Sequence, residues 1–242
     1  MKRLFILLFI FFADYNAFGQ CGNGLTIFRE TFGGSFSSVD IGPPLSLGTS
    51  LYSYNGINSI SEGEYGLRKK TGAMNAWAEG TDFTGQGGYM MMVHSKKSIS
   101  TFYETTVKGF CKAQSQSLCF SAASLSKKGL DRDAIIHVEI RSNSTNNLLG
   151  TFIAPALKNN DSITWSTFTF TYPLPKGENS VHLLFSSSST TSIPDDFAID
   201  DIKLVNIGGS LNNSTTYDNE YPLINGRYEY PVFACLNERV IF

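Results

Sequence analysis

The sequence predicts an all-β fold, namely an antiparallel β-sandwich of jelly-roll type. Apolar and polar residues alternate with a period of two along much of the chain, whereas helical periodicity is almost absent. Turn signals such as Asn55-Gly56 and Gly87-Gly88 separate the alternating runs. Many short strands at such spacing are typical of sandwiches and jelly rolls.

Five segments carry the clearest strand patterns. In residues 136–140, Ile136, Val138 and Ile140 alternate with polar side chains, which predicts a half-buried antiparallel strand. The uninterrupted apolar run at 89–93 predicts a largely buried strand. The other predicted strands are 166–172, 181–185 and 197–205.

Residues 1–19 are typical of a signal peptide. A basic start precedes an apolar run at 4–12, and the small residues Ala17 and Gly19 suit cleavage before Gln20. The run is too short to span a bilayer, which needs about 20 residues, and no later run approaches that length. The sequence therefore predicts a secreted or cell-surface, extracellular protein with no membrane span in the mature chain.

The charge balance predicts that nucleic acid is not a partner. The chain has 19 Lys and Arg against 21 Asp and Glu. Removal of the predicted signal peptide takes away Lys2, Arg3 and Asp14, leaving 17 against 20, or about −3. Such a surface has no basic field to attract phosphates.

The mature length suits one β domain, which we predict at residues 20–207. The composition changes after Val205, where a Gly-, Ser- and Asn-rich linker begins at residue 208. Residues 217–242 are aromatic and too short to fold alone. Residues 208–242 are therefore predicted as a linker and a short C-terminal extension.

The four cysteines predict disulfides, because their number is even and an extracellular compartment is oxidising. Cys111 and Cys119 bracket a polar stretch that could turn between two strands, which makes them the favoured pair. Cys21 and Cys235 would then join the two ends. A zinc site is not expected, since no Cys/His cluster occurs.

Two adjacent carboxylates, Asp200 and Asp201, interrupt the apolar strand at 197–205. Because a strand points successive side chains to opposite faces, one of them shares a face with some of its apolar neighbours. An unpaired buried carboxylate is costly, and proteins pair it or bind a metal there. The pattern predicts either a bound cation or a strand at a sheet end, where both carboxylates are hydrated or accept hydrogen bonds from backbone N–H groups.

The order of several motifs resembles the MAM-type jelly-roll domains of extracellular adhesion proteins, and still more the related β-sandwich modules of secreted Bacteroidetes proteins. The resemblance covers about residues 21–207. The cysteines depart from the MAM pattern, since Cys111 and Cys119 are closer together than the long-range pair typical there. The motifs that carry it are Phe28/Glu30, Trp77, 82–90, Cys119-Phe120, Trp165 and 198–202.

The resemblance also implies a calcium ion where the first and last strands meet. Calcium takes six to eight oxygen ligands, backbone carbonyls included, in flexible geometry. By motif, the implied ligands are Glu30, Asp82 and either Asp200 or Asp201, with Thr84 as a possible fourth. The implied ion is structural, because the set leaves no obvious open position for a substrate.

Aromatic side chains raise the possibility of sugar binding, since their faces stack on pyranose rings. Tyr52 and Tyr54, on a Gly- and Ser-rich segment, and Trp77 are the candidate ligand-binding residues, whereas Trp165 is expected in the core. No catalytic motif of jelly-roll glycosidases occurs, and the exposed carboxylate pairs lie on turns rather than across a cleft.

These observations favour a non-catalytic recognition or adhesion module that binds glycans or extracellular protein surfaces. A polysaccharide hydrolase, or an accessory domain of one, is the alternative from another class. A structural cell-surface component is the third. Fold-level resemblance does not decide among the three.

Overall fold

The computed structural model describes most of residues 21–207 and two short segments beyond them. The predicted signal peptide, the predicted linker and nearly all of the predicted extension lie outside the described residues. No described helix is both long and apolar enough to cross a membrane. The described residues are 21, 24–33, 39–57, 59–71, 77–85, 87–110, 115–129, 134–188, 195–207, 223–224 and 227–228.

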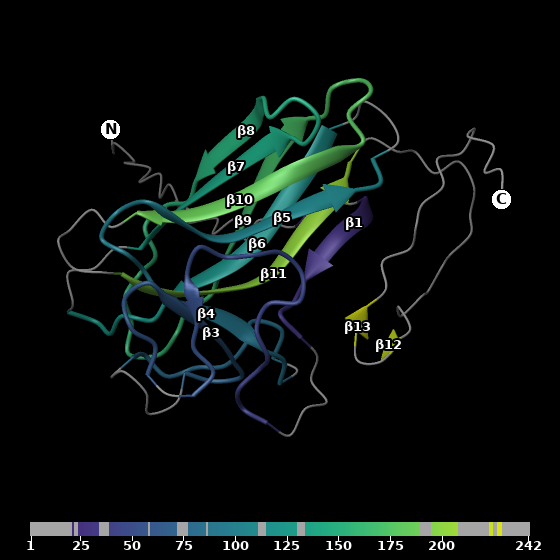
Figure 1. The fold of residues 1–242 in the computed structure, drawn as a ribbon. Coiled ribbons are helices and arrows are strands. Elements are labelled where there is room, and N and C mark those ends of the chain that lie inside the picture. The colour runs from purple at the N-terminus through teal and green to yellow at the C-terminus, as the bar shows by residue number, and fades with distance from the viewer. Residues whose placement is uncertain are drawn as a thin grey trace, which may run out of the picture.

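Two packed β-sheets form the body of the molecule, which confirms the predicted all-β sandwich (Figure 1). The regular elements of the described residues are all strands. They are β1 (Leu25–Glu30), β2 (Ser53–Tyr54), β3 (Glu64–Arg68), β4 (Met90–His94), β5 (Ser100–Lys108), β6 (Ser115–Ser124), β7 (Ile135–Ser142), β8 (Leu148–Ile153), β9 (Ser166–Pro173), β10 (Ser180–Ser188), β11 (Asp196–Asn206), β12 (Leu223–Ile224) and β13 (Arg227–Tyr228).

The larger sheet has seven strands in the order β2-β3-β4-β11-β6-β9, with β1 also paired to β11. The smaller sheet has four strands in the order β5-β10-β7-β8. Strand β4 pairs with β11 over Asp196–Ile199, and β1 pairs with β11 over Ile202–Asn206. The first strand and β4 thus follow one another along β11 and leave a gap beside Asp200 and Asp201.

The main core lies between the two sheets and is rich in aromatic rings. Phe102 lies 4.9 Å from Phe197 and Phe120 lies 5.3 Å from Phe185, centroid to centroid, in edge-to-face contacts that join the two sheets. Ile136, Val138 and Ile140 of β7 are fully buried there, as their alternation predicts.

A second, smaller apolar cluster covers the other face of the larger sheet. Met90 and Met92 of β4 belong to it, while Met91 and Val93 face the main core. Strand β4 is therefore buried on both faces, as its uninterrupted apolar run predicts. Trp77, Leu125, Ala198 and Ile60 complete the cluster.

The disulfide of the described chain joins Cys21 to Cys119, so both predicted pairings are wrong. Residues 115–117 already belong to β6, and Cys119 lies inside that strand rather than after a turn. Cys111 and Cys235 lie outside the described residues. The bond spans 98 residues, and in the chain-entropy account a loop of that length contributes about 4–5 kcal/mol to stability.

Candidate functional site

A β-bulge in β11 places the two adjacent aspartates. Asp200 pairs with Ser121 and Lys203 with Cys119, so β11 has one residue more than β6 in this stretch. Asp201 is the inserted residue of the bulge. Its φ is 52°, in the left-handed region that aspartate enters more readily than most residues. Ile199 before the bulge and Ile202 after it both face the main core, so the bulge keeps both aspartates off that face.

Asp200 is fully buried, and backbone N–H groups are its hydrogen-bond donors. The amide of Phe83 donates to Oδ2 at 3.0 Å, and the amide of Asp201 donates to Oδ1 at 2.7 Å. Burial raises the pKa of Asp200 well above its ordinary value, and the nearby charges of Asp201 and Asp82 add to that rise. Among the described residues, no basic side chain pairs with this carboxylate.

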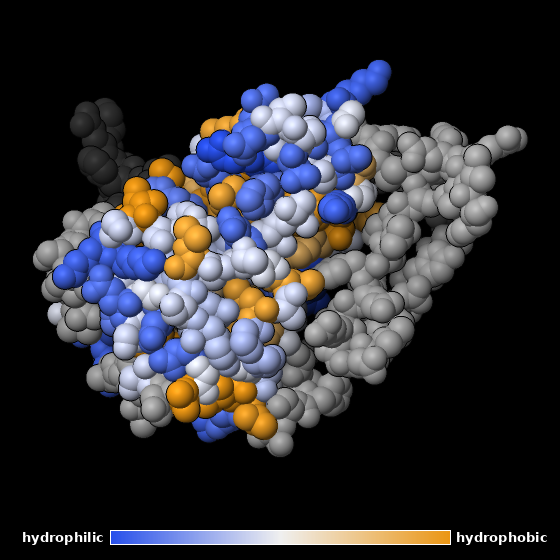
Figure 2. Space-filling model, in the orientation of Figure 1, coloured by the Kyte–Doolittle hydropathy of each residue, from blue (hydrophilic) through white to orange (hydrophobic). Residues whose placement is uncertain are grey.

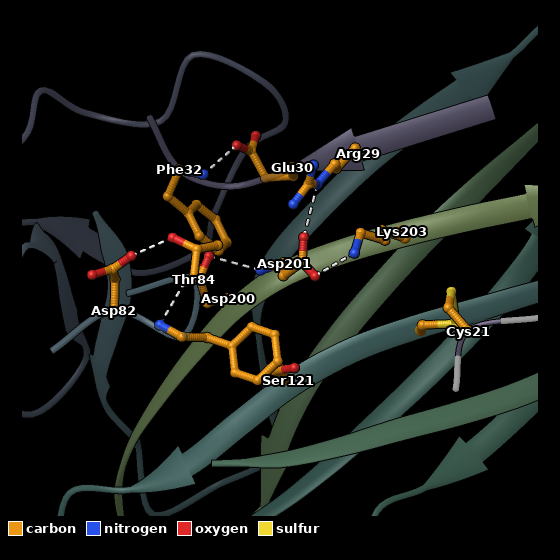
Figure 3. A network of polar contacts seen from close by, with 12 residues as sticks. Cys21, Arg29, Glu30, Phe32, Asp82, Thr84, Ser121, Asp200, Asp201 and Lys203 are labelled. Carbon is orange, nitrogen blue, oxygen red and sulfur yellow. Dashed lines mark hydrogen bonds and ion pairs between the residues drawn. A yellow bond between two sulfur atoms is a disulfide. The ribbon is translucent and has the colours of Figure 1, made fainter. Parts of the chain in front are cut away.

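Asp82 and Thr84 flank Phe83 on the loop whose backbone reaches Asp200 in the gap between β4 and β1. The Thr84 hydroxyl donates to Asp82 Oδ2, and both side chains face each other in Figure 3. A Cβ built on Gly88 would lie 3.0 Å from the Gly33 carbonyl oxygen, 3.5 Å from Asp82 Oδ2 and 3.8 Å from Thr84 Oγ1. Three oxygens therefore line a small volume that only a glycine at position 88 leaves open.

Glu30 ends β1 on the other side of the gap. It is buried, and its Oε1 accepts a hydrogen bond of 2.6 Å from the Phe32 amide. Burial raises the pKa of Glu30 from 4.5 to about 7, although the amides of Phe32 and Thr31 oppose the rise. Like Asp200, Glu30 is a buried acid without a basic partner among the described residues.

Asp201 belongs to a different environment. Its Oδ1 lies 2.8 Å from Arg29 Nε, and its Oδ2 lies 2.6 Å from Lys203 Nζ. Figure 3 shows this carboxylate between the two basic side chains, away from Asp82 and Thr84. Of the two aspartates predicted as alternative ligands, Asp200 is thus the one that the structure brings to Asp82.

The carboxylates, the threonine hydroxyl and the carbonyl are all hard oxygen donors, which suit calcium better than zinc or copper. No group of three or more His, Cys, Asp or Glu side chains within the described ranges has a metal-holding arrangement. A site here would therefore depend on backbone and hydroxyl oxygens as well as carboxylates.

The predicted sugar-binding aromatics are mostly buried, and this prediction is wrong for Tyr52 and Trp77. The hydroxyl of Tyr52 shares a hydrogen bond of 3.0 Å with Ser187 Oγ of the smaller sheet, which fixes the ring between the layers. Trp77 belongs to the second apolar cluster. Tyr54 is half-buried, and its ring packs 5.5 Å from that of Tyr65.

Among the described aromatic side chains, the exposed one is Phe83, and it contacts Trp165; we call these two residues the ring pair. The two rings meet nearly edge to face with centroids 5.8 Å apart. Phe83 is 37% exposed, and Trp165 is half-buried against the second cluster. An aromatic residue inside a polar, Gly-rich turn is the sequence signal that could have identified Phe83.

Two paired loop segments hold the ring pair. The Ile163 amide donates to the Glu79 carbonyl at 2.9 Å, and the Glu79 amide donates to the Asp161 carbonyl at 3.2 Å. Trp165 Nε1 donates to the Thr81 carbonyl at 3.1 Å. The polar side chains of Glu79, Thr81, Asp161, Ser162 and Thr164 on these segments are exposed.

Comparison with known proteins adds a likeness of fold. No family model matches the chain, and no curated protein matches it either, so the resemblance to MAM-type domains stays a prediction. Among solved structures, TmCBM61 in complex with β-1,4-galactotriose is 12% identical, with a TM-score of 0.40 over 59% of this chain and 81% of that one.

Two further solved structures are similar at the same level. The CBM22-1 xylan-binding domain of Paenibacillus barcinonensis Xyn10C is 12% identical, with a TM-score of 0.43 over 79% of this chain and 100% of its own. A cyclase from Fischerella sp. TAU, in complex with 4-(1H-indol-3-yl)butan-2-one, is 14% identical, with a TM-score of 0.49 over 75% of this chain and 96% of that one. At such identities the likeness concerns the β-sandwich fold and does not extend to a ligand or an activity.

Proposed function

We propose that this chain is a non-catalytic extracellular recognition module that binds glycans at the ring pair. The observation that carries the proposal is the exposed Phe83 ring, held edge to face against Trp165 on paired loop segments. The predicted signal peptide and the Cys21–Cys119 disulfide support an extracellular location, because disulfides persist in oxidising compartments.

The ring pair suits a sugar because it joins a flat apolar surface to hydrogen-bonding groups. The C–H face of a pyranose ring packs on an aromatic ring, while its hydroxyls need polar partners such as the exposed Thr81, Asp161 and Thr164. The rings are already fixed by packing and hydrogen bonds, which lowers the ordering cost of binding.

Other exposed apolar side chains do not make such a surface. On the face shown in Figure 2 the described surface is largely hydrophilic, and apolar side chains form small separate groups. Ile57 and Ile99 are more exposed than Phe83, at 77% and 69%, but they are aliphatic and offer no aromatic face. Scattered exposures of that kind are ordinary on soluble proteins.

The buried acids support binding rather than hydrolysis. Glu30, Asp82 and Asp200 are each at most 5% exposed, so a polysaccharide on the surface does not reach them. Hydrolysis of a glycosidic bond needs two carboxylates on either side of the bond within a cleft. We assign these acids to the stability of the fold.

We further propose that a structural calcium ion binds beside Asp200, in the gap between β4 and β1. Asp200, Asp82, Thr84 and Glu30 are the candidate ligands, with the Gly33 carbonyl beside them. Bound calcium would supply the positive charge that these buried acids lack. Asp201 is not a candidate, because Arg29 and Lys203 already neutralise it.

A glycan array tests the recognition proposal. We expect the wild-type protein to bind a subset of the glycans, Phe83→Ala to lose that binding by at least about tenfold, as expected for about 1.4 kcal/mol, and Ile99→Ala to keep it. Ile99 is the matched control, since it is an exposed apolar residue remote in sequence from the paired segments. An array without wild-type signal would contradict glycan binding and direct attention to protein partners.

A further inference from the structure

We infer that Asp200 is a positioning residue of the ring pair, and that it sets the binding surface through the backbone of Phe83. The inference rests on the proposed function of the ring pair. Glycan binding would then depend on a carboxylate that the glycan does not touch. Asp200 has no exposed surface, whereas the Phe83 ring is 37% exposed.

The link between the two residues is direct. The Phe83 amide donates to Asp200 Oδ2 at 3.0 Å. The buried carboxylate is thus bonded to the backbone of Phe83, while the ring of Phe83 is exposed. The side chains on either side of Phe83, those of Asp82 and Thr84, bond to each other and hold the same turn. The Phe83 ring therefore extends from a backbone segment that Asp200 fixes.

Trp165 is joined to the same unit by two routes. Its Nε1 donates to the carbonyl of Thr81, two residues before Phe83. Strand β9, which begins one residue after Trp165, also lies in register with Asp200, since Asp200 pairs with Ser121 of β6, and Ser121 pairs with Thr167 of β9. The hydroxyls of Ser121 and Thr167 lie 3.0 Å apart and tie this row of residues together. Phe83 is therefore held by a hydrogen bond to Asp200, and Trp165 lies two residues before Thr167, at the other end of this row of paired residues.

The hydrogen bonds of Asp200 require a carboxylate, because both of its oxygens act as acceptors. Each of its oxygens accepts one backbone N–H, from Phe83 and from Asp201. Asparagine has one acceptor oxygen, and its NH2 group would face the second N–H, so one of the two bonds must be lost. Asp200→Asn therefore releases the Phe83 segment or the bulge, with almost no change in side-chain volume.

The first test needs no ligand. In a Trp77→Phe background Trp165 is the remaining tryptophan, and we expect Asp200→Asn to raise its quenching by acrylamide. Asp201→Asn is the matched control, because it removes a neighbouring carboxylate without a bond to the Phe83 segment. Unchanged quenching in Asp200→Asn, or an equal rise in Asp201→Asn, would overturn the inference.

The second test is a double-mutant cycle on the arrayed glycans that bind the wild type. We expect Asp200→Asn to weaken binding about tenfold, the effect of about 1.4 kcal/mol, and to cause little further loss in Phe83→Leu. A general structural effect would instead add to that of Phe83→Leu, and additivity overturns the inference. If no glycan binds at all, the proposed function fails while the quenching test still decides the role of Asp200.

A measurement on the unaltered protein covers the case in which Asp200→Asn does not fold. Hydrogen exchange observed by NMR should show a protected Phe83 amide, since that N–H is bonded to a buried carboxylate. A Phe83 amide that exchanges as fast as an exposed loop amide would contradict the link.

Discussion

Glu30 and Asp200 show how a carboxylate can be buried without a basic partner. Each accepts a hydrogen bond from a backbone N–H: Glu30 from Phe32, two residues further along the chain, and Asp200 from Phe83 on a loop distant in sequence. These bonds favour the ionised form, but the loss of water outweighs them, so the pKa of each acid is raised. Asp201 differs because Arg29 and Lys203 supply the compensating charge.

The raised pKa of Glu30 predicts a pH dependence of stability in calcium-free buffer. Below pH 4.5 the acid is protonated in both states, and between 4.5 and about 7 the folded state retains a proton that the unfolded state has lost. The free energy of unfolding should therefore fall as pH rises through this window, by roughly 3 kcal/mol from Glu30. Asp200 acts in the same direction.

Denaturant unfolding at a series of pH values measures this effect. Glu30→Gln should flatten the profile between pH 4.5 and 7 relative to wild type, while Glu62→Gln, at an exposed position on a turn, should leave it unchanged. Parallel profiles for Glu30→Gln and wild type would contradict the account of this residue.

At the scale of the element, the bulge in β11 decides which side chains meet. Strict alternation across the strand would place Ile199 and Ile202 on opposite faces, yet both lie in the main core. The extra residue, Asp201, absorbs the change with a positive φ. Since β4 and β1 stop on either side of this point, the loop with Asp82 and Thr84 can reach Asp200.

Asp200→Asn and Asp201→Asn, at two adjacent residues of the bulge, form a matched pair that tests the calcium proposal. At pH 7.5 and a calcium concentration about 100 times the Kd, binding should add about 2.7 kcal/mol, or roughly 5–10 °C in Tm for a domain of this size. Asp200→Asn should abolish this increment. Asp201→Asn should keep it, because that carboxylate pairs with basic side chains.

Differential scanning calorimetry with calcium and with a chelator makes the comparison. No change of Tm between the two conditions in the wild type would remove the calcium proposal. An increment of equal size in Asp200→Asn would remove Asp200 from the ligand set.

Elements with a clean alternation could be predicted from the sequence, and those set by distant contacts could not. The pattern in β7 identified Ile136, Val138 and Ile140 as core residues, because one face of that strand is buried and the other is partly hydrated. The bulge at Asp201 has no such local signal. Trp165 was expected in the core, and the structure leaves it half-buried, packed against the second cluster and in contact with the Phe83 ring.

At the scale of the whole molecule, the strand patterns in the sequence predict a sandwich, but they do not predict the contacts between residues that are far apart in the sequence. Cys119 could be placed in a pair only once β6 and the N-terminal segment were seen to lie together. Tyr52 is buried for the same reason, since its hydroxyl reaches Ser187 in the other sheet. Asp82 was predicted near Asp200 from the order of motifs, and the packing of its loop against β11 brings the two carboxylates close enough for their charges to interact. Glu30 lies on β1 opposite Ile202, and its place in a shared ligand set stays a prediction.

Recognition of a sugar at the ring pair is the central claim, and saturation-transfer difference NMR tests it most directly. With an oligosaccharide chosen from the array, saturation of aromatic protein protons should pass to the C–H protons of one sugar face. Phe83→Ala should remove this transfer and Ile99→Ala should retain it, because Ile99 is exposed but is an aliphatic residue outside the ring pair. Transfer of equal strength in Phe83→Ala and the wild type would contradict the claim.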